Sequence, residues 1–413
     1  GFTDNLSSKF QYFAGKDCME QFINHLLVYQ DKSKVYLNAF NGSRFDHYEF
    51  VKQLNRMFDD GNGLKLEKLL LNNGAILKAT VKNIECFDIS KHITGTLRQN
   101  LEELGCKVQK GEFDYSLGDD WDKMSPASRS DCIEYLKGDV MGLKELSQKL
   151  NQSCFDSFSV NLYKFMSTSQ LTYAVWVNHW YKESTNPIYL QNPEQEKFFR
   201  ESIYGGRTYK YKHNFTSSQR DAFMKNKIAF EDIDDYLIDA DVNSLYPAAM
   251  MKEFPVGVAI MLDNTTTATF NEFIGNHGKC PNIGIFRINY ITNKNLIDGI
   301  LPRREGGRLL WDLKDSSGVY NSVDIDNALS CGYKVDIIEG YYWESTAKVF
   351  NNYIEFLYKF KKQAKKGTAQ YTLAKLMIIR FWMVQIWYTL NDIIFLRREY
   401  PLMCTKFDKT KSH

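Results

Sequence analysis

The chain has 413 residues, of which 44% are hydrophobic and 25% charged, a composition that predicts a globular protein of two or three domains and excludes a largely disordered one. Its formal net charge of +2 excludes binding of nucleic acid through overall charge, so any such binding must come from local basic patches. The eight cysteines form no Cys-x-x-Cys pair, so the sequence indicates neither a zinc site nor a disulfide framework and favours a reducing, intracellular setting.

Short strands alternate with helices in the first part of the sequence. The apolar pattern predicts, in chain order, a strand at 34–37, a helix at 48–57, a strand pair at 76–81 and 84–89, and helices at 97–104 and 129–150. Asn41, Phe45 and Asp46 lie between the first strand and the first helix. On the last of these helices, Tyr135 and Asp139 are four residues apart and therefore share one face.

The later part of the sequence mixes strands with one long helical stretch. A short buried strand is expected at 236–242, further strands at 283–291 and 334–342, and amphipathic helix at 347–377. Residues 376–396 approach the length of a membrane span, but Arg380 and Asp392 interrupt them. Because charge at mid-bilayer is costly, we expect no membrane span.

The most specific string in the chain is Asp241-Val242-Asn243-Ser244-Leu245-Tyr246-Pro247. Phosphoryl transfer in a two-metal site needs a carboxylate fixed at a strand end, and a turn that brings a backbone carbonyl and a triphosphate to the same ion. Asp241 has the position of the carboxylate and Val242 that of the neighbouring carbonyl. Tyr246, on the first turn of the next helix, is placed to lie beneath the sugar of an incoming nucleotide.

This string resembles motif A of the protein-primed family B DNA polymerases, which occur in phages, adenoviruses, linear mitochondrial plasmids and self-synthesising transposons. The resemblance implies that Asp241 is one of two metal-binding aspartates of the polymerase site and that Tyr246 rejects ribonucleotides. Lys375, followed by Leu-Met, resembles the start of motif B, in which a helical lysine binds the triphosphate.

Two strings nearer the N-terminus resemble motifs of the family's 3′-5′ exonuclease. The first implies that Asn41 and Phe45 hold single-stranded DNA while Asp46 binds metal. The second implies that Tyr135 orients the attacking water and that Asp139 binds the second metal. Each string alone is typical of an ordinary structural pair, so their order and spacing carry the resemblance.

Two further segments extend the same resemblance. Lys110 and Tyr115 match a segment in which the lysine assists exonucleolysis and the tyrosine touches the primer end. The turn at Gly205 and Gly206, followed by Arg207, resembles a Tyr-x-Gly-Gly motif that grips template DNA, although isoleucine stands in place of its tyrosine. A glycine pair lets backbone amides approach phosphates, but a plain connecting turn is the alternative.

The resemblance covers about residues 34–377 and departs from the family pattern at both ends. No Asp-x-Glu pair precedes Asn41, no Asp-Thr-Asp string follows Lys375, and motif B changes abruptly after Met377. We therefore expect a chain truncated at both ends and inactive or nearly so, because one carboxylate cannot hold both metal ions. We also hypothesise a frameshift after Met377, which would leave residues 378–413 unrelated to the fold.

The implied fold combines α/β and α+β parts. It consists of an incomplete ribonuclease H-like 3′-5′ exonuclease, a partial family B palm and part of the fingers. The expected regions are the exonuclease at 1–150, a connecting region and the start of the palm at 151–256, a palm insertion resembling the terminal-protein-contact region at 257–345, a fingers helix at 346–377 and a non-matching tail at 378–413.

The implied function is that of a DNA-directed DNA polymerase with two-metal Mg²⁺ sites. Its expected partners are DNA template and primer, deoxynucleoside triphosphates and a terminal protein, in a mitochondrial, viral or mobile-element setting. One alternative is a single-stranded nucleic-acid-binding remnant that uses Arg207, Lys210, Lys212 and the lysines at 361–366. Another is a stand-alone ribonuclease H-like exonuclease, which has no use for the nucleotide-binding turn at 241–247.

Overall fold

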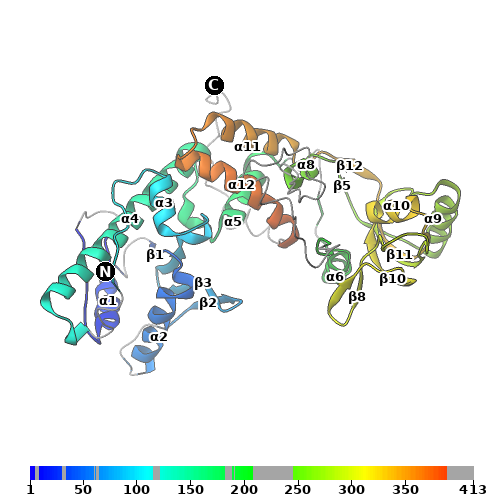
Figure 1. Ribbon diagram of the computed structural model, residues 1–413. Helices are drawn as coiled ribbons and strands as arrows, with labels where there is room; N and C mark the ends of the chain where they lie inside the picture. The colour runs from blue at the N-terminus through cyan, green and yellow to red at the C-terminus, as the bar shows by residue number, and fades with distance from the viewer. Residues whose placement is uncertain are drawn as a thin grey trace, which may run out of the picture. The chain divides into compact units, whose positions relative to one another are not determined.

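The chain forms two compact units in the computed structural model, and each unit is described by itself. The first joins Gly1–Tyr181 to Phe350–His413, and the second is Lys182–Val349 (Figure 1). The structure describes residues 1–4, 9–29, 34–59, 61, 65–114, 121–181, 188–189, 191–207 and 245–387, with only the backbone of 382–387. The strand expected at 236–242 lies outside these ranges.

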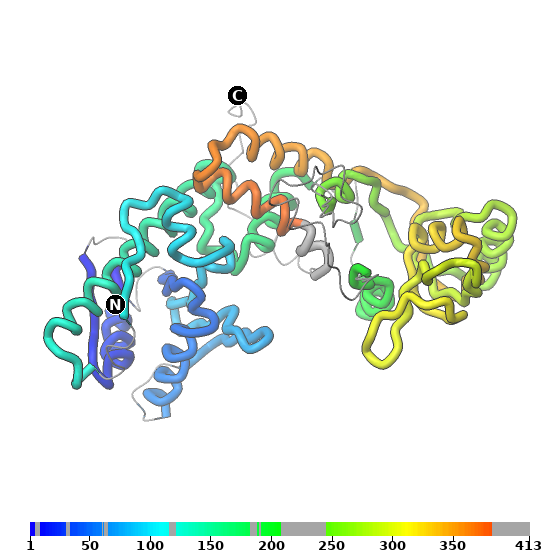
Figure 2. The backbone as a smooth tube through the Cα atoms, in the orientation of Figure 1, coloured from blue at the N-terminus to red at the C-terminus, as the bar shows by residue number. Residues whose placement is uncertain are grey.

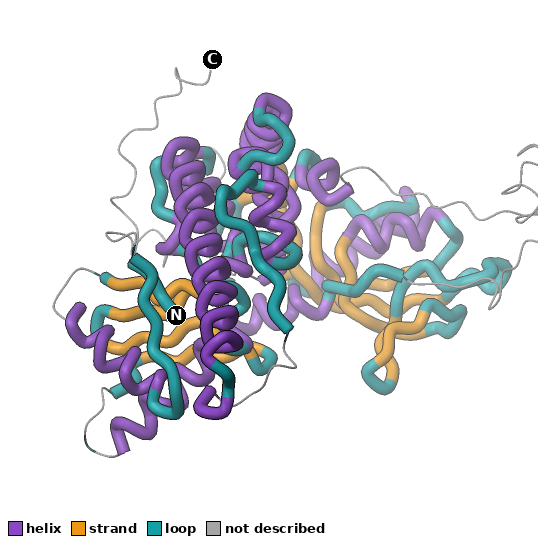
Figure 3. The backbone as a smooth tube through the Cα atoms, turned by 60° about the vertical axis from the view of Figure 1, so that its left-hand side comes forward, coloured by secondary structure: helices purple, strands orange, loops and turns teal. Residues whose placement is uncertain are grey.

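A four-stranded sheet of order β1-β4-β3-β2 organises the first unit. Strand β1 (Val35–Ala39) runs parallel to β4 (Ile84–Asp88), while β3 (Ala75–Val81) is antiparallel to both β4 and β2 (Lys68–Asn72). The predicted pairing of 76–81 with 84–89 is confirmed, and Figure 3 shows these strands as one layer. All of β4 is buried and all of β2 is exposed, as expected for a central and an edge strand.

Helices α1 (Cys18–Leu26) and α2 (Asp46–Asp59) bury their apolar stripes against this sheet. The stripe of α2 follows the helical period, so that Phe50, Leu54 and Met57 all face inward. The resulting core contains Ile23, Leu26, Phe50, Val51, Leu54, Met57, Ile76, Ala79, Val81, Ile84 and Cys86. Short 3₁₀ turns occur at Leu27–Tyr29, Gly42–Arg44, Ile89–Lys91, Trp121–Lys123 and Leu162–Lys164.

Five further helices complete the first unit: α3 (Leu97–Glu103), α4 (Pro126–Phe158), α5 (Thr168–His179), α11 (Asn351–Gln363) and α12 (Ala369–Trp387). Helix α5 is buried along almost its whole length because α12 packs against it (Figure 2). The single amphipathic stretch predicted at 347–377 is two helices, separated by a turn in which Gly367 has a φ of +86°.

Helix α12 contradicts the expectation that the fold ends at Met377. It continues to Trp387, and the Phe381 ring is 0% exposed between Trp176, Phe350 and Tyr353. Arg380 donates hydrogen bonds to the carbonyls of Lys91 and Ile93. Residues 378–381 keep the apolar spacing of a packed helix, so they belong to this core whether or not a frameshift precedes them. Residues 388–413 lie outside the described part.

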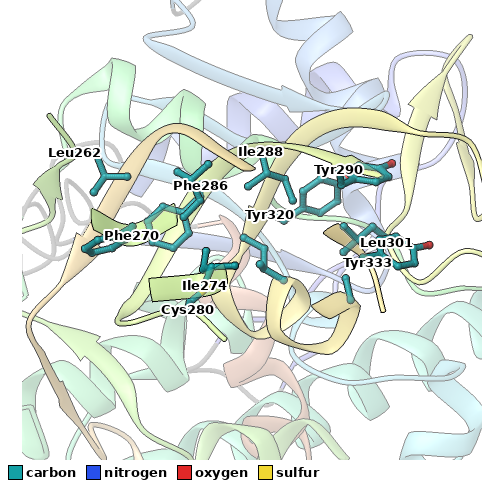
Figure 4. Packing of buried hydrophobic residues seen from close by; sticks show 13 residues of the cluster. Leu262, Phe270, Ile274, Cys280, Phe286, Ile288, Tyr290, Leu301, Tyr320 and Tyr333 are labelled. Atoms are coloured by element: carbon teal, nitrogen blue, oxygen red, sulfur yellow. The ribbon is translucent and has the colours of Figure 1, made fainter. Parts of the chain in front are cut away.

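The second unit is built on a sheet of order β10-β7-β11-β6, in which all neighbours are antiparallel. Its strands are β6 (Ile260–Met261), β7 (Ile283–Ile291), β10 (Ser316–Asn321) and β11 (Lys334–Trp343), so the predictions for 283–291 and 334–342 are confirmed. Helices α9 (Asn264–His277) and α10 (Ser322–Ser330) cover it and enclose an aromatic core that includes Phe270, Phe286 and Tyr320 (Figure 4).

The second unit also contains smaller elements. They are α6 (Pro193–Glu201), α8 (Leu245–Met250), the strand pair β5 (Phe254–Val256) and β12 (Ser345–Ala347), and the hairpin β8 (Arg303–Glu305) with β9 (Arg308–Leu310). None of the helices in the described ranges is both long enough and apolar enough for a membrane crossing.

We predict that Phe381→Ala lowers the free energy of unfolding by about 3–5 kcal/mol, because it leaves a cavity among three aromatic rings. Urea unfolding followed by tryptophan fluorescence measures this loss. The matched control is Ile379→Ala, whose side chain is 48% exposed and whose loss should stay within about 0.5 kcal/mol. Equal, small losses for the two variants would contradict the packing of α12.

Candidate functional site

The loop after β1 is held by a buried carboxylate from the neighbouring strand. Asp88 ends β4, which is parallel to β1, so the two strands deliver their ends to the same edge of the sheet. The Asp88 carboxylate accepts hydrogen bonds from the amides of Asn41 (2.9 Å), Ser43 (3.1 Å) and Ser90 (3.0 Å). Sequence reasoning missed Asp88, although the predicted strand at 84–89 carried a carboxylate near its end.

Hydrogen bonding sets the charge state of Asp88. Burial by itself would raise the pKa of this carboxyl, but the hydrogen bonds from Ser90 and Ser43 outweigh burial and hold the pKa below its ordinary value. Lys91 Nζ lies 3.9 Å from the carboxylate and adds a favourable charge. Asp88 is therefore ionised at neutral pH and can fix two amides of the loop at once.

The anchored loop presents Asn41 and Phe45 in different ways. Asn41 adopts a left-handed conformation with a φ of 61° and is half-buried, whereas the Phe45 side chain is 65% exposed. A Cβ at Gly42 would lie 2.6 Å from Cβ of Ala39 and 2.8 Å from Nε2 of His47, so this turn requires glycine. The loop is thus a tight, well-packed support for an exposed aromatic ring.

Asp46 begins α2 and is exposed to solvent. A carboxylate in the first turn of a helix is stabilised by the helix dipole, so a structural role accounts for this residue without any ligand. The predicted metal ligand Asp46 is therefore placed at the expected strand-to-helix junction, while its metal-binding role stays a prediction.

Helix α4 holds the segment that carries Lys110. The Glu145 carboxylate accepts hydrogen bonds from the amides of Lys107 and Val108, and Lys149 Nζ donates to the carbonyls of Leu104 (3.0 Å) and Gly105 (2.8 Å). These bonds fasten residues 104–108 along the helix. As a result, Lys110 lies next to the face of α4 that carries Tyr135 and Asp139.

The structure brings together Lys110, Tyr135 and Asp139. Lys110 Nζ lies 2.9 Å from Oδ2 of Asp139 and 5.3 Å from the centroid of the Tyr135 ring. Burial lowers the pKa of Lys110, but hydrogen bonds with Tyr135 and Asp139 outweigh it and leave the pKa raised, so the lysine stays charged at neutral pH. Phe113 packs on Tyr135 with ring centroids 5.3 Å apart. Tyr115 lies outside the described residues.

The metal-binding role of Asp139 stays a prediction. Lys110 takes one carboxylate oxygen of Asp139, and the other, Oδ1, is buried and has no hydrogen-bond partner. No group of three or more His, Cys, Asp or Glu side chains able to hold a metal occurs in the described part of the chain. The cation described beside Asp139 is the ammonium of Lys110.

The glycine turn of the second unit follows α6. Arg207 Nη2 lies 2.6 Å from a carboxylate oxygen of Asp298, and a Cβ on Gly206 would meet no atom within 4 Å. Tyr204 lies next to Ile203, which occupies the position of the motif tyrosine. Its hydroxyl donates to the Val319 carbonyl at 3.0 Å and its ring stacks on Tyr320, so it is a partly buried residue that packs against the core of the second unit.

The residues predicted for the polymerase site are only partly described. Asp241 and Val242 lie outside the described residues. Tyr246 lies on the first turn of α8, as predicted, and is 52% exposed. Lys375 is exposed on α12, one turn beyond Tyr371.

A basic and aromatic hollow lies on the same helical hairpin as Lys375. It has a volume of about 520 Å³ and is lined by Tyr358, Lys359, Lys361, Lys362, Ala364, Lys366 and Tyr371. Lys361 Nζ lies 5.9 Å from the centroid of the Tyr371 ring. The lysine run noticed in the sequence therefore forms one local cationic surface.

Residues 122–378 match the family described as DNA polymerase type B, organellar and viral. The chain belongs to this family. The resemblance inferred from motifs is thereby confirmed, whereas the individual site residues stay predictions.

Curated relatives of this type B chain are fungal proteins named as probable DNA polymerases. The protein from Agaricus bitorquis is 22% identical over 375 residues, which are 82% of this chain and 44% of the relative. The protein from Neurospora intermedia is 26% identical over 255 residues, 60% of this chain and 24% of the relative. The chain thus spans less than half the length of these relatives.

Solved structures of Phi29 DNA polymerase share the fold. The ternary complex with primer-template DNA and incoming nucleotide is 17% identical, with a TM-score of 0.59 over 88% of this chain and 60% of that one. The complex with single-stranded DNA is 16% identical, with a TM-score of 0.57 over 87% of this chain and 60% of that one. The predicted fold class, an exonuclease-like α/β part followed by palm and fingers parts, is confirmed.

We predict that Asp88→Asn lowers the free energy of unfolding by about 1–3 kcal/mol at pH 7, because two loop amides lose a charged acceptor. The folded-state pKa of Asp88 is depressed, so its contribution is present above the ordinary aspartate pKa of about 3.9 and is lost as the pH falls through the folded-state value.

Urea unfolding of both proteins from pH 7 downward tests this, with Asp59→Asn at the exposed end of α2 as control. The gap between wild type and Asp88→Asn should close in acid. A gap that stays constant with pH would contradict the assigned charge state.

Proposed function

We propose that the chain forms the part of a protein-primed DNA polymerase that holds a single strand of DNA and the triphosphate of an incoming nucleotide. The observation that carries the proposal is the Phe45 ring, 65% exposed on a loop whose amides are fixed by Asp88. An exposed ring on a rigid support can stack on a base with little further loss of entropy.

The single strand is assigned to the first unit. Asn41 carries an amide that can hydrogen-bond a base or sugar, and Lys110 supplies a positive charge beside the face of α4. The solved structures of Phi29 polymerase include complexes with single-stranded DNA and with primer-template DNA. These shared partners, together with the common fold, support DNA as the partner of this chain.

The triphosphate is assigned to Lys375 and to the neighbouring hollow lined by Lys361, Lys362 and Lys366. Ammonium groups on an exposed helix face match the charge of a polyphosphate. In the proposal Asp241 would hold Mg²⁺, Val242 would contact the nucleotide and Tyr246 would contact its sugar, as the sequence predicts. Gly205, Gly206 and Arg207 would contact the template, and residues 257–345 would meet a terminal protein.

We further propose that this chain binds DNA without extending it. Its 413 residues supply one of the two motif carboxylates of the polymerase site, and the charge of Lys110 faces Asp139 in the exonuclease-like part. The second candidate function, a single-strand-binding remnant without chemistry, is favoured by the same ion pair and by the basic hollow. The stand-alone exonuclease is disfavoured, because such a nuclease has no use for the nucleotide-binding turn at 241–247.

We predict that Phe45→Ala weakens binding of fluorescently labelled single-stranded DNA by about tenfold, the effect of losing one stacked base. Fluorescence anisotropy at several salt concentrations measures it. The matched control is Phe58→Ala near the end of α2, whose ring is 49% exposed and whose loss should leave the affinity unchanged. Equal affinities of wild type and Phe45→Ala would refute the assigned role of the ring.

We also predict that EDTA leaves this single-strand affinity unchanged, because the groups assigned to the strand are the Phe45 ring, the Asn41 amide and the Lys110 ammonium, none of which needs a metal ion. In primer extension with Mg²⁺ or Mn²⁺, the chain alone should bind the primer-template but add no nucleotides, with Phi29 polymerase as positive control. Sustained extension by this chain would overturn the proposal that it lacks polymerase chemistry.

A further inference from the structure

Arg304 of the β8-β9 hairpin makes three contacts with the segment that precedes the glycine turn. Its Nη1 donates to the Glu201 carbonyl at 2.8 Å and its Nη2 donates to the Ile203 carbonyl at 2.7 Å. Its guanidinium lies 4.3 Å from the centroid of the Tyr204 ring. The exposed Arg304 side chain therefore contacts Glu201, Ile203 and Tyr204, which lie just before Gly205 in the sequence.

The two acceptor carbonyls explain why an arginine suits this position. Glu201 ends α6, and the last carbonyls of a helix lack partners within the helix. The planar guanidinium can donate to two oxygens while its face lies on an aromatic ring, whereas an ammonium offers a point charge and no planar surface. A cation near the C-terminal end of α6 is also favoured by the helix dipole.

The ring beneath Arg304 is itself fixed. Tyr204 stacks on Tyr320 with ring centroids 5.2 Å apart and an interplanar angle of 16°, and its hydroxyl donates to the Val319 carbonyl. Tyr320 is 0% exposed in the core of the second unit (Figure 4). The arginine thus joins the glycine turn to the rigid sheet rather than to a free loop.

The other end of the turn is held by a separate contact from the same region. Arg207 pairs with Asp298 at 2.6 Å, and a Cβ on Gly205 would lie 3.6 Å from a Leu309 methyl of β9. Space around Gly206 is open. The turn is therefore fastened on both sides, while its middle is accessible to a large ligand.

We propose that Arg304 is a positioning residue, which orders the Gly205-Gly206 turn so that its backbone amides can meet the sugar-phosphate backbone of DNA. This inference rests on the proposed function, since it assigns the ligand of the turn as a nucleic-acid backbone. Ordering the amides before binding removes part of the entropy loss on association. Because Arg304 is exposed and the Tyr204–Tyr320 stack does not depend on it, its replacement should leave the core folded.

The test compares Arg304→Met with the matched control Arg308→Met in the full chain. Arg308 is an exposed arginine of the same hairpin. Hydrogen–deuterium exchange of the amides at 203–207 should quicken by about tenfold in Arg304→Met, the effect of losing a hydrogen bond to a charged donor. Arg308→Met should leave it unchanged. Exchange in β7 and β10 should be the same in all proteins, which excludes general unfolding.

Binding is then measured with a labelled primer-template DNA. Arg304→Met should weaken it several-fold, Arg304→Lys should recover part of the loss by donating to one carbonyl, and Arg308→Met should lose less than Arg304→Met. Unchanged exchange at 203–207 in Arg304→Met would overturn the inference. Faster exchange at 203–207 with undiminished DNA binding would also overturn the inference. In that case a weaker single-strand affinity of Phe45→Ala would still support the proposed function. Absence of DNA binding by the wild type would overturn the proposed function and the assigned ligand together, and the exchange data would still report on the contact itself.

Discussion

The parallel pairing of β1 with β4 is the constraint on which the candidate single-strand site depends. It brings Asp88 of one strand beside the loop that leaves the other, and the buried carboxylate then fixes the amides of Asn41 and Ser43. Because the loop is bonded from beneath and Gly42 allows it to pack tightly, the Phe45 ring can be exposed without being loose. The position of the exposed Phe45 ring therefore depends on Asp88, a buried residue that a ligand does not need to touch.

Charge distinguishes the two halves of the proposed function. In the exonuclease-like part the cation described beside Asp139 is the ammonium of Lys110, which pairs with one oxygen of that carboxylate. Around Lys375 the lysines outnumber acidic groups and surround a hollow, an arrangement that attracts phosphate.

The second unit adds a separate aromatic core, and its hairpin β8-β9 reaches the glycine turn through Arg304. The helical core of the first unit in turn extends past the last residue that resembles motif B, since Phe381 fills a space between α5 and α11. In both places packing and hydrogen bonding, rather than motif residues, determine where the functional segments lie.

Local pattern by itself determined much of this protein. The period of apolar residues located β1, β3, β4, β7, β11 and the helices α2, α3 and α4, and the order of short motifs identified the polymerase family, because both signals depend on neighbours in sequence. Tertiary structure alone decided the roles of Asp88, Tyr204 and Arg304. Each of them acts on a segment far away in the sequence, through strand order or through a contact between elements, and no local spacing encodes which distant carbonyl, amide or ring a side chain will meet.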